Sequence, residues 1–191
     1  MNIGIDIDDI ITETSEFLMT YVAEYFSIDI YYLIRNNICY NNLPKQYKEK
    51  EVEFGKSTFG RVLLDVKLKQ NAKEIIDKLK KEGNKIIIIT ARDKTIYDDP
   101  FGFTLKQLKK LGIKYDKLVC SFDKRQVCIN EDIDLFIDDC IDNLNKVEDS
   151  VNKVLLFNSQ TNIGKNNNFT RVNSWKEIYE YISEYKKVKD L

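Results

Sequence analysis

Histidine is absent from the 191 residues of this sequence. Its absence excludes every mechanism that depends on imidazole, including Ser-His catalytic triads, histidine-ligated zinc and phosphoryl transfer through histidine. Any chemistry must therefore be carried out by carboxylates, lysine, arginine and hydroxyl groups.

Cysteine is scarce and unpaired in the sequence. The cysteines at 39, 120, 128 and 140 form no CxxC motif. In a chain of this length, this spacing favours reduced, mostly buried thiols over a disulfide framework or a zinc site.

Excess charge and long apolar runs are also missing. The 30 Lys+Arg residues nearly balance the 31 Asp+Glu residues, so the formal net charge is -1, and this balance favours neither a nucleic-acid polymer nor a membrane surface as partner. No apolar run approaches the roughly 20 residues of a membrane span, and the N-terminus lacks the pattern of a signal peptide. We therefore expect a soluble, cytoplasmic protein.

The most informative stretch comes at the start of the chain. Residues 2–7 are apolar apart from Asn2 and Asp6 and predict a buried parallel strand, whose carboxyl end opens at Asp6 and Asp8. Alternation along a strand predicts that these two carboxylates lie on the same side of an extended chain, where a hard cation such as Mg²⁺ would keep both ionised. The alternative is an ordinary acidic helix N-terminus after a strand.

The segment after this strand has a different character. Apolar residues recur at helical spacing from Phe17 to Phe26, which predicts an amphipathic helix capped by Thr12 or Thr14. The pattern then becomes irregular to about residue 69, with short helical runs and no buried strand. We interpret residues 14–69 as a small helical insertion, whose aromatic residues form either its own core or a surface for stacking.

From residue 70 onward, strand and helix patterns alternate. Together with the first strand, four further apolar segments predict five strands, the four being 85–90, 118–121, 133–137 and 154–157. Such alternation predicts an α/β fold with a doubly wound parallel sheet, in which residues 1–13 and 70–191 form the Rossmann-like core domain.

Polar residues follow several of these strands. Because the carboxyl ends of parallel strands share one edge of the sheet, that edge should gather Asp6, Asp8, Thr90, Lys124, Asp138 and Asp139. Carboxylates from the first and fourth strands would hold Mg²⁺, while a hydroxyl and an ammonium group would hold the oxygens of a phosphate.

These motifs, in this order, resemble the four motifs of the haloacid dehalogenase superfamily, and the resemblance covers nearly the whole chain. The runs IITAR, SFDK and RVNSW are more narrowly similar to the type C 5′-nucleotidase group. The resemblance implies a phosphomonoesterase, most specifically a 5′(3′)-nucleotidase acting on ribo- or deoxyribonucleoside monophosphates, with the insertion as a cap over the site.

The resemblance also implies roles for individual residues. Asp6 would be the nucleophile that becomes an aspartyl-phosphate, and Asp8 the general acid-base. The phosphoryl group would be bound by Thr90, Ala91 and Lys124.

The implied cofactor is Mg²⁺, held by the carboxylates of Asp6 and Asp138 and by the backbone carbonyl of Asp8. Asp139 would contact the metal through water or support its ligands. The chain departs from the family at Asp9, where many members carry a small residue, and at Ile10, where Thr or Val is common. We expect these departures to change local geometry more than chemistry.

Phe17, Tyr21 and Arg92 are the candidate substrate-contacting residues. The preferred base and sugar, the position of the phosphate and the oligomeric state remain open. A sugar phosphate or another small phosphorylated metabolite is the alternative substrate, and a non-catalytic phosphate-binding protein of the same fold is the alternative class. A receiver-type phosphoacceptor domain fits poorly, because its acceptor Asp lies on a separate middle strand.

Overall fold

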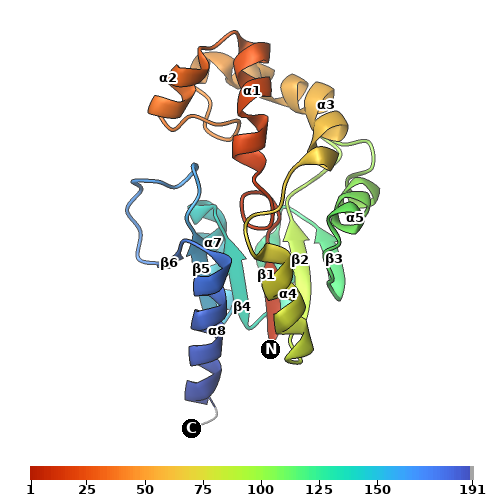
Figure 1. Ribbon diagram of the computed structural model, residues 1–191, viewed down its shortest axis with the longest axis vertical. Helices are drawn as coiled ribbons and strands as arrows, with labels where there is room; N and C mark the ends of the chain where they lie inside the picture. Colours follow the sequence, from red (N-terminus) through yellow and green to blue (C-terminus); the bar gives the residue numbers. More distant parts are fainter. Residues whose placement is uncertain (190–191) are drawn as a thin grey trace.

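The centre of the protein is a parallel sheet of six strands in the order β3-β2-β1-β4-β5-β6. The computed structural model describes residues 1–189, and Figure 1 shows the arrangement of its elements. The strands are β1 (Asn2–Ile5), β2 (Lys85–Thr90), β3 (Lys117–Cys120), β4 (Leu135–Asp138), β5 (Lys153–Phe157) and β6 (Thr170–Val172). The sequence predicted five strands; β6 escapes the pattern because it is short and only its last residue is buried.

Helices cover both faces of this sheet, which confirms the doubly wound α/β class. One face packs against residues of α4 (Ala72–Lys81), α5 (Pro100–Leu111) and α8 (Trp175–Lys189). The other face packs against α6 (Lys124–Asn130) and α7 (Ile141–Val147), which the short 3-10 helix η3 (Glu148–Ser150) follows. Because both faces are covered, the central strands β1, β2 and β4 are buried almost throughout.

The segment between β1 and α4 is helical and lies beyond the carboxyl ends of the strands (Figure 1). Its elements are α1 (Thr14–Phe26), α2 (Ile30–Arg35), η1 (Lys45–Lys50), α3 (Glu51–Val62) and η2 (Leu63–Asp65). It has a hydrophobic cluster of its own that includes Phe26 and Phe54. Part of its aromatic content therefore serves its own packing.

The first strand is shorter than predicted. It ends at Ile5, although the Asp6 amide still donates to the Ile137 carbonyl of β4 at 3.0 Å. The chain then turns, and the amides of residues 10, 11 and 12 all point to the carbonyl of Ile7 at 2.9–3.3 Å. The predicted end of the strand at Ile7 is therefore wrong, since the strand ends at Ile5 and the turn occupies residues 9–11. Asp6 and Asp8 still lie close enough together for the charge of Asp8 to raise the pKa of Asp6.

The predicted cap of α1 is also wrong. Neither threonine caps the helix: the Thr12 hydroxyl donates to the Ile7 carbonyl at 3.1 Å, and the Thr14 hydroxyl donates to Asp8 Oδ1 at 2.8 Å. The N-cap residue, Glu13, makes no capping hydrogen bond through its side chain.

Asp9 performs the capping instead. Its Oδ1 accepts from the Ser15 amide in the first turn of α1 at 2.8 Å, and its Oδ2 accepts from the Ser15 hydroxyl. Asp9 adopts a left-handed backbone conformation with φ 61°, which aspartate tolerates better than most residues. Asp9, where the chain departs from the pattern of the family that it resembles, thus fixes the direction in which the helical segment leaves the sheet.

All four cysteines are free thiols, as predicted; Cys39 and Cys128 are buried, while Cys120 and Cys140 are half-buried. Within residues 1–189, none of the helices combines the length and the apolar character that a membrane crossing requires.

Candidate active site

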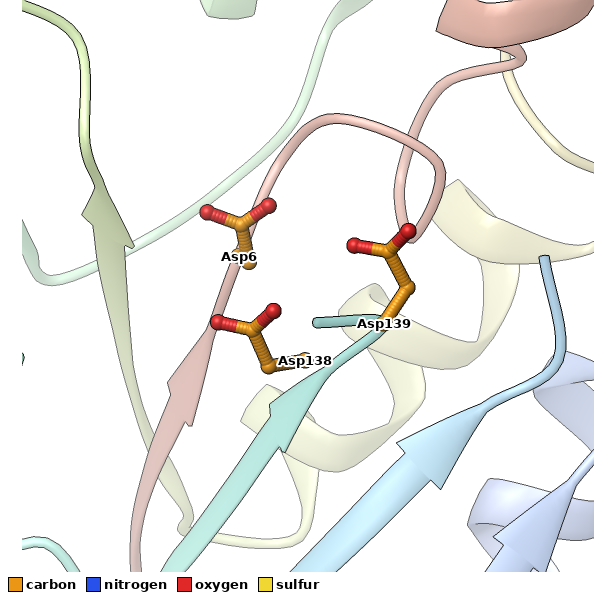
Figure 2. A group of neighbouring side chains, drawn as sticks. All are labelled: Asp6, Asp138 and Asp139. Carbon is orange, nitrogen blue, oxygen red and sulfur yellow. The ribbon is translucent and has the colours of Figure 1, made fainter. Parts of the chain in front are cut away.

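Three buried carboxylates meet at the carboxyl edge of the sheet. Asp6 follows β1, Asp138 ends β4 and Asp139 comes next, and each offers an oxygen within 4.8 Å of the others. Figure 2 shows the three side chains facing a common space. Their donor set is oxygen only, which matches the preference of Mg²⁺ and disfavours softer metals. The cluster therefore fits a hard divalent cation.

Lys124 lies between two of these carboxylates. Its Nζ donates to Asp6 Oδ1 and to Asp138 Oδ2, both at 2.7 Å, and its side chain is only 4% exposed. It is the first residue of α6, whose N-cap Asp123 accepts from the Gln126 amide at 3.0 Å. Burial lowers the pKa of the Lys124 ammonium, but Asp138 and Asp6 outweigh that effect and hold the pKa above its ordinary value. Lys124 is therefore a fixed positive charge in the cluster.

The cluster is electrostatically costly without a divalent cation. Burial raises the pKa of Asp6, Lys124 lowers it, and the charges of Asp138 and Asp8 raise it further, to about 7. Burial and the neighbouring carboxylates also raise the pKa of Asp139 well above its ordinary value. A bound cation would favour the ionised forms of both groups.

Hydrogen bonds hold the two carboxylates at the carboxyl end of β4 in place. Asp138 Oδ1 accepts from the Cys140 amide at 2.8 Å, and its Oδ2 accepts from Asn143 Nδ2 at 3.0 Å. Asp139 Oδ2 accepts from the hydroxyls of Ser159 and Thr161, both at 2.7 Å. The loop after β5 thus orients Asp139. The polar sequence of this loop did not distinguish it from an ordinary surface turn.

Asp8 has a different environment from the other acids. It is not part of the three-carboxylate cluster; Arg92 donates to it from Nη2 at 2.9 Å and from Nε at 3.3 Å. The guanidinium is held in turn by the side-chain oxygen of Gln107 at 2.7 Å, and Gln107 donates to the Leu63 carbonyl at 2.6 Å. A buried chain of hydrogen bonds therefore links Asp8 to η2, where the helical segment returns to the sheet.

Thr90 and Ala91 lie where the sequence predicted, at the carboxyl end of β2. Thr90 is 1% exposed, and both residues line the same cavity as Asp6 and Lys124. The structure thus brings together all six residues expected at this edge, with Asp6 and Asp8 both just beyond the last residue of β1.

A cavity of about 820 Å³ lies over these groups, between the sheet edge and the helical segment. Its volume is within the usual range for small-molecule sites. The aromatic residues that line it are Tyr40, Phe54, Phe59, Tyr97 and Phe122.

The other predicted substrate contacts are placed differently. Phe17 and Tyr21 are not among the described residues that line the cavity; they pack against a cluster formed by Leu18 and its neighbours. Arg92 does line the cavity, but it is 6% exposed and engaged with Asp8. The aromatic side chains that line the cavity are therefore better placed than Phe17 and Tyr21 for contact with a substrate.

Tyr40 is one functional candidate that the sequence did not reveal. Burial raises the pKa of its hydroxyl, and the charges of Asp8, Asp9 and Asp139 raise it further, which places the side chain close to the acids. Its ring packs edge-on against Phe59 at 5.3 Å between centroids. No periodicity in this irregular segment marks Tyr40, because its position depends on how the segment folds over the sheet.

Comparison with models of protein families gives a match over nearly the whole chain. A family model described as "5′ nucleotidase, deoxy (Pyrimidine), cytosolic type C protein" matches residues 1–188. No curated protein matches the sequence.

Several solved structures share the fold. A Had-superfamily hydrolase from Ehrlichia chaffeensis has a TM-score of 0.60 at 12% identity, with 96% of each chain covered. A haloacid dehalogenase-like hydrolase from Streptococcus pneumoniae has a TM-score of 0.64 at 14% identity, covering 95% of this chain and 97% of that one. A beta-phosphoglucomutase from Clostridium difficile has a TM-score of 0.62 at 15% identity, covering 100% and 99%. At these identities the likeness shows the fold alone.

Proposed function

The chain belongs to the cytosolic type C 5′-nucleotidase family of haloacid dehalogenase-type phosphatases, and from this premise we propose that it hydrolyses nucleoside monophosphates with the help of Mg²⁺. The reaction would pass through an aspartyl-phosphate on Asp6. Water would then release inorganic phosphate from that intermediate.

One observation carries the proposal. Lys124 Nζ lies 2.7 Å from both Asp6 and Asp138, beneath a cavity large enough for a nucleotide. Phosphoryl transfer needs a positioned nucleophile and concentrated positive charge more than any other feature, and this arrangement offers both.

The residues of the chain divide the work between them. Asp6 attacks phosphorus, and the bond between phosphorus and the ester oxygen breaks as that oxygen takes a proton from Asp8. Asp8 then removes a proton from water, and the water oxygen attacks the aspartyl-phosphate and restores the Asp6 carboxylate. The Thr90 hydroxyl, the Ala91 backbone amide and the Lys124 ammonium hold the non-bridging phosphoryl oxygens.

The proposed Mg²⁺ ligands are the carboxylates of Asp6 and Asp138 and the backbone carbonyl of Asp8, with Asp139 in contact through water. When bound, the cation would supply positive charge against the phosphoryl oxygens. Arg92 is proposed to orient Asp8, since its guanidinium is already engaged with that carboxylate.

We further propose that residues 14–69 act as a cap on a core of residues 1–13 and 70–191. The cap would exclude bulk water and provide the aromatic surface for a base, with Tyr40 and Phe59 as the best placed side chains. The stacking role predicted for Phe17 and Tyr21 has no support from their positions.

The test is phosphate release from a panel of ribo- and deoxyribonucleoside monophosphates and sugar phosphates, with and without Mg²⁺. We expect Mg²⁺-dependent release from nucleotides, and no release by Asp6→Asn. Faster release from sugar phosphates would favour the alternative substrate class. No release from any ester would favour a non-catalytic phosphate-binding protein.

A further inference from the structure

Gln107 is a buried polar residue that the proposed chemistry does not use. It lies in α5, it is fully buried, and it is not among the described residues that line the cavity. A buried amide is unfavourable unless both its oxygen and its nitrogen find partners. The partners of Gln107 therefore indicate what the side chain does at this position.

The amide of Gln107 joins two groups of opposite hydrogen-bonding character. Its Nε2 donates to the Leu63 carbonyl at 2.6 Å, and its Oε1 accepts from Arg92 Nη1 at 2.7 Å. A carbonyl oxygen can only accept and a guanidinium can only donate, so these two partners fix the orientation of the amide. A glutamate could not donate to Leu63, and a lysine could not accept from Arg92. The position therefore needs the donor and the acceptor that one amide provides.

The guanidinium of Arg92 is held from several sides. The rings of Tyr97 and Phe103 have their centroids 5.7 and 5.6 Å from its Cζ. Among its hydrogen bonds within residues 1–189, the one to Gln107 is the shortest. A planar guanidinium presents its donors in fixed directions, so a rotation that breaks the bond to Gln107 also moves the donors that face Asp8.

Arg92 contacts Asp8 in a way that leaves the two carboxylate oxygens unequal. Oδ1 accepts from Arg92 Nη2 at 2.9 Å and from the Thr14 hydroxyl at 2.8 Å, whereas Oδ2 accepts from Arg92 Nε at 3.3 Å. The Asp8 side chain is 21% exposed and lines the cavity. Oδ2 is the less engaged oxygen and is therefore better placed to exchange a proton with the leaving group.

We infer that Gln107 is a positioning residue for proton transfer, which fixes Arg92 and thereby holds Asp8 Oδ2 toward the leaving oxygen of the substrate. This inference rests on the proposed function. Because Gln107 lies outside the cavity, its effect must pass through Arg92 and Asp8. A strongly basic leaving group needs the proton and a nitrophenolate does not, so the loss of Gln107 should slow hydrolysis of a nucleotide more than that of a nitrophenyl ester.

The experiment measures the first chemical step in Gln107→Met, which removes both hydrogen bonds and changes the side-chain volume little. The single-turnover rate on dUMP is compared with the burst of nitrophenol from p-nitrophenyl phosphate, both with Mg²⁺. We expect the dUMP rate to fall by about tenfold or more, because a small misplacement of a reacting group can cost about 100-fold, and the burst to fall much less. Leu108→Ala is the control, since Leu108 is the next residue of α5 and is fully buried. This variant should change both rates by a common factor.

The double variant Asp8→Asn, Gln107→Met tests the path of the effect. If Gln107 acts through Asp8, the ratio of the two rates in the double variant should equal the ratio in Asp8→Asn. Equal effects on the two rates in Gln107→Met or in Asp8→Asn, or a further change of the ratio in the double variant, would overturn the role of Gln107 while the nucleotidase activity stands. Failure of the wild type to hydrolyse any nucleotide would overturn the proposed function and the role of Gln107 with it.

Discussion

Replacing Lys124 with methionine removes the positive charge that separates Asp6 from Asp138. The lysine and the two carboxylates have side chains that are 4%, 9% and 1% exposed, so water cannot compensate for the loss. Removing one partner of a buried ion pair typically costs about 3–5 kcal/mol. We expect Lys124→Met to lower the free energy of unfolding by about that amount at pH 7 in EDTA.

The loss should depend on pH in a defined direction. Burial raises the pKa of Asp6 and Lys124 lowers it, to a net value of about 7, so without the lysine the folded-state pKa should rise further. An acid whose pKa is higher in the folded state than its unfolded value of about 4 keeps a proton that the unfolded chain releases. The destabilisation of Lys124→Met should therefore be smallest near pH 4 and grow as pH rises through 7.

The assay is urea unfolding followed by the fluorescence of Trp175, the single tryptophan, which is fully buried. Lys117→Met is the matched control, because Lys117 pairs with Glu131 at the surface with 54% of its side chain exposed, and such pairs contribute about 0–1 kcal/mol. Adding Mg²⁺ should recover part of the loss in Lys124→Met. Equal losses in the two variants, or a loss independent of pH, would refute the view that Lys124 neutralises the cluster.

Three further predictions follow from the site. Activity should disappear in excess EDTA and return with Mg²⁺, and Asp138→Ala should raise the metal concentration required or abolish turnover; full activity in EDTA would contradict the metal assignment. Asp6→Asn should be inactive on every substrate. In Asp8→Asn, the burst of nitrophenol released from p-nitrophenyl phosphate should fall much less than the single-turnover rate on a nucleotide, because nitrophenolate can leave without taking a proton. A burst that falls as steeply as the nucleotide rate would show that Asp8 acts through the fold or the metal. Asp9→Ala should lower the free energy of unfolding by about 1–2 kcal/mol, because the hydrogen bond from the Ser15 amide that caps α1 is lost. Asp9→Asn should lower the free energy of unfolding by less. Equal losses for the two variants in urea titrations would exclude the cap as the cause.

The sequence by itself determined the fold class and the edge at which the polar residues gather. Two apolar runs predict buried strands, Lys85–Thr90 and the run that ends at Asp138. The reason is that parallel strands covered on both faces are continuously apolar. Regular alternation with helices makes such strands parallel, and parallel strands bring their carboxyl ends together. The proximity of Asp6, Thr90 and Asp138 follows from local pattern and topology, without knowledge of any side-chain contact.

Only the tertiary structure decided how the residues around that edge are used. Arg92 and Asp8 are separated by 84 positions, and Tyr40 reaches the acids from an irregular segment whose orientation no periodicity records. Asp9 and not a threonine caps α1, because the chain turns sharply after Ile7. These features arise from the packing of the helical segment against the end of the sheet, and that packing depends on the simultaneous fit of many side chains distant in sequence.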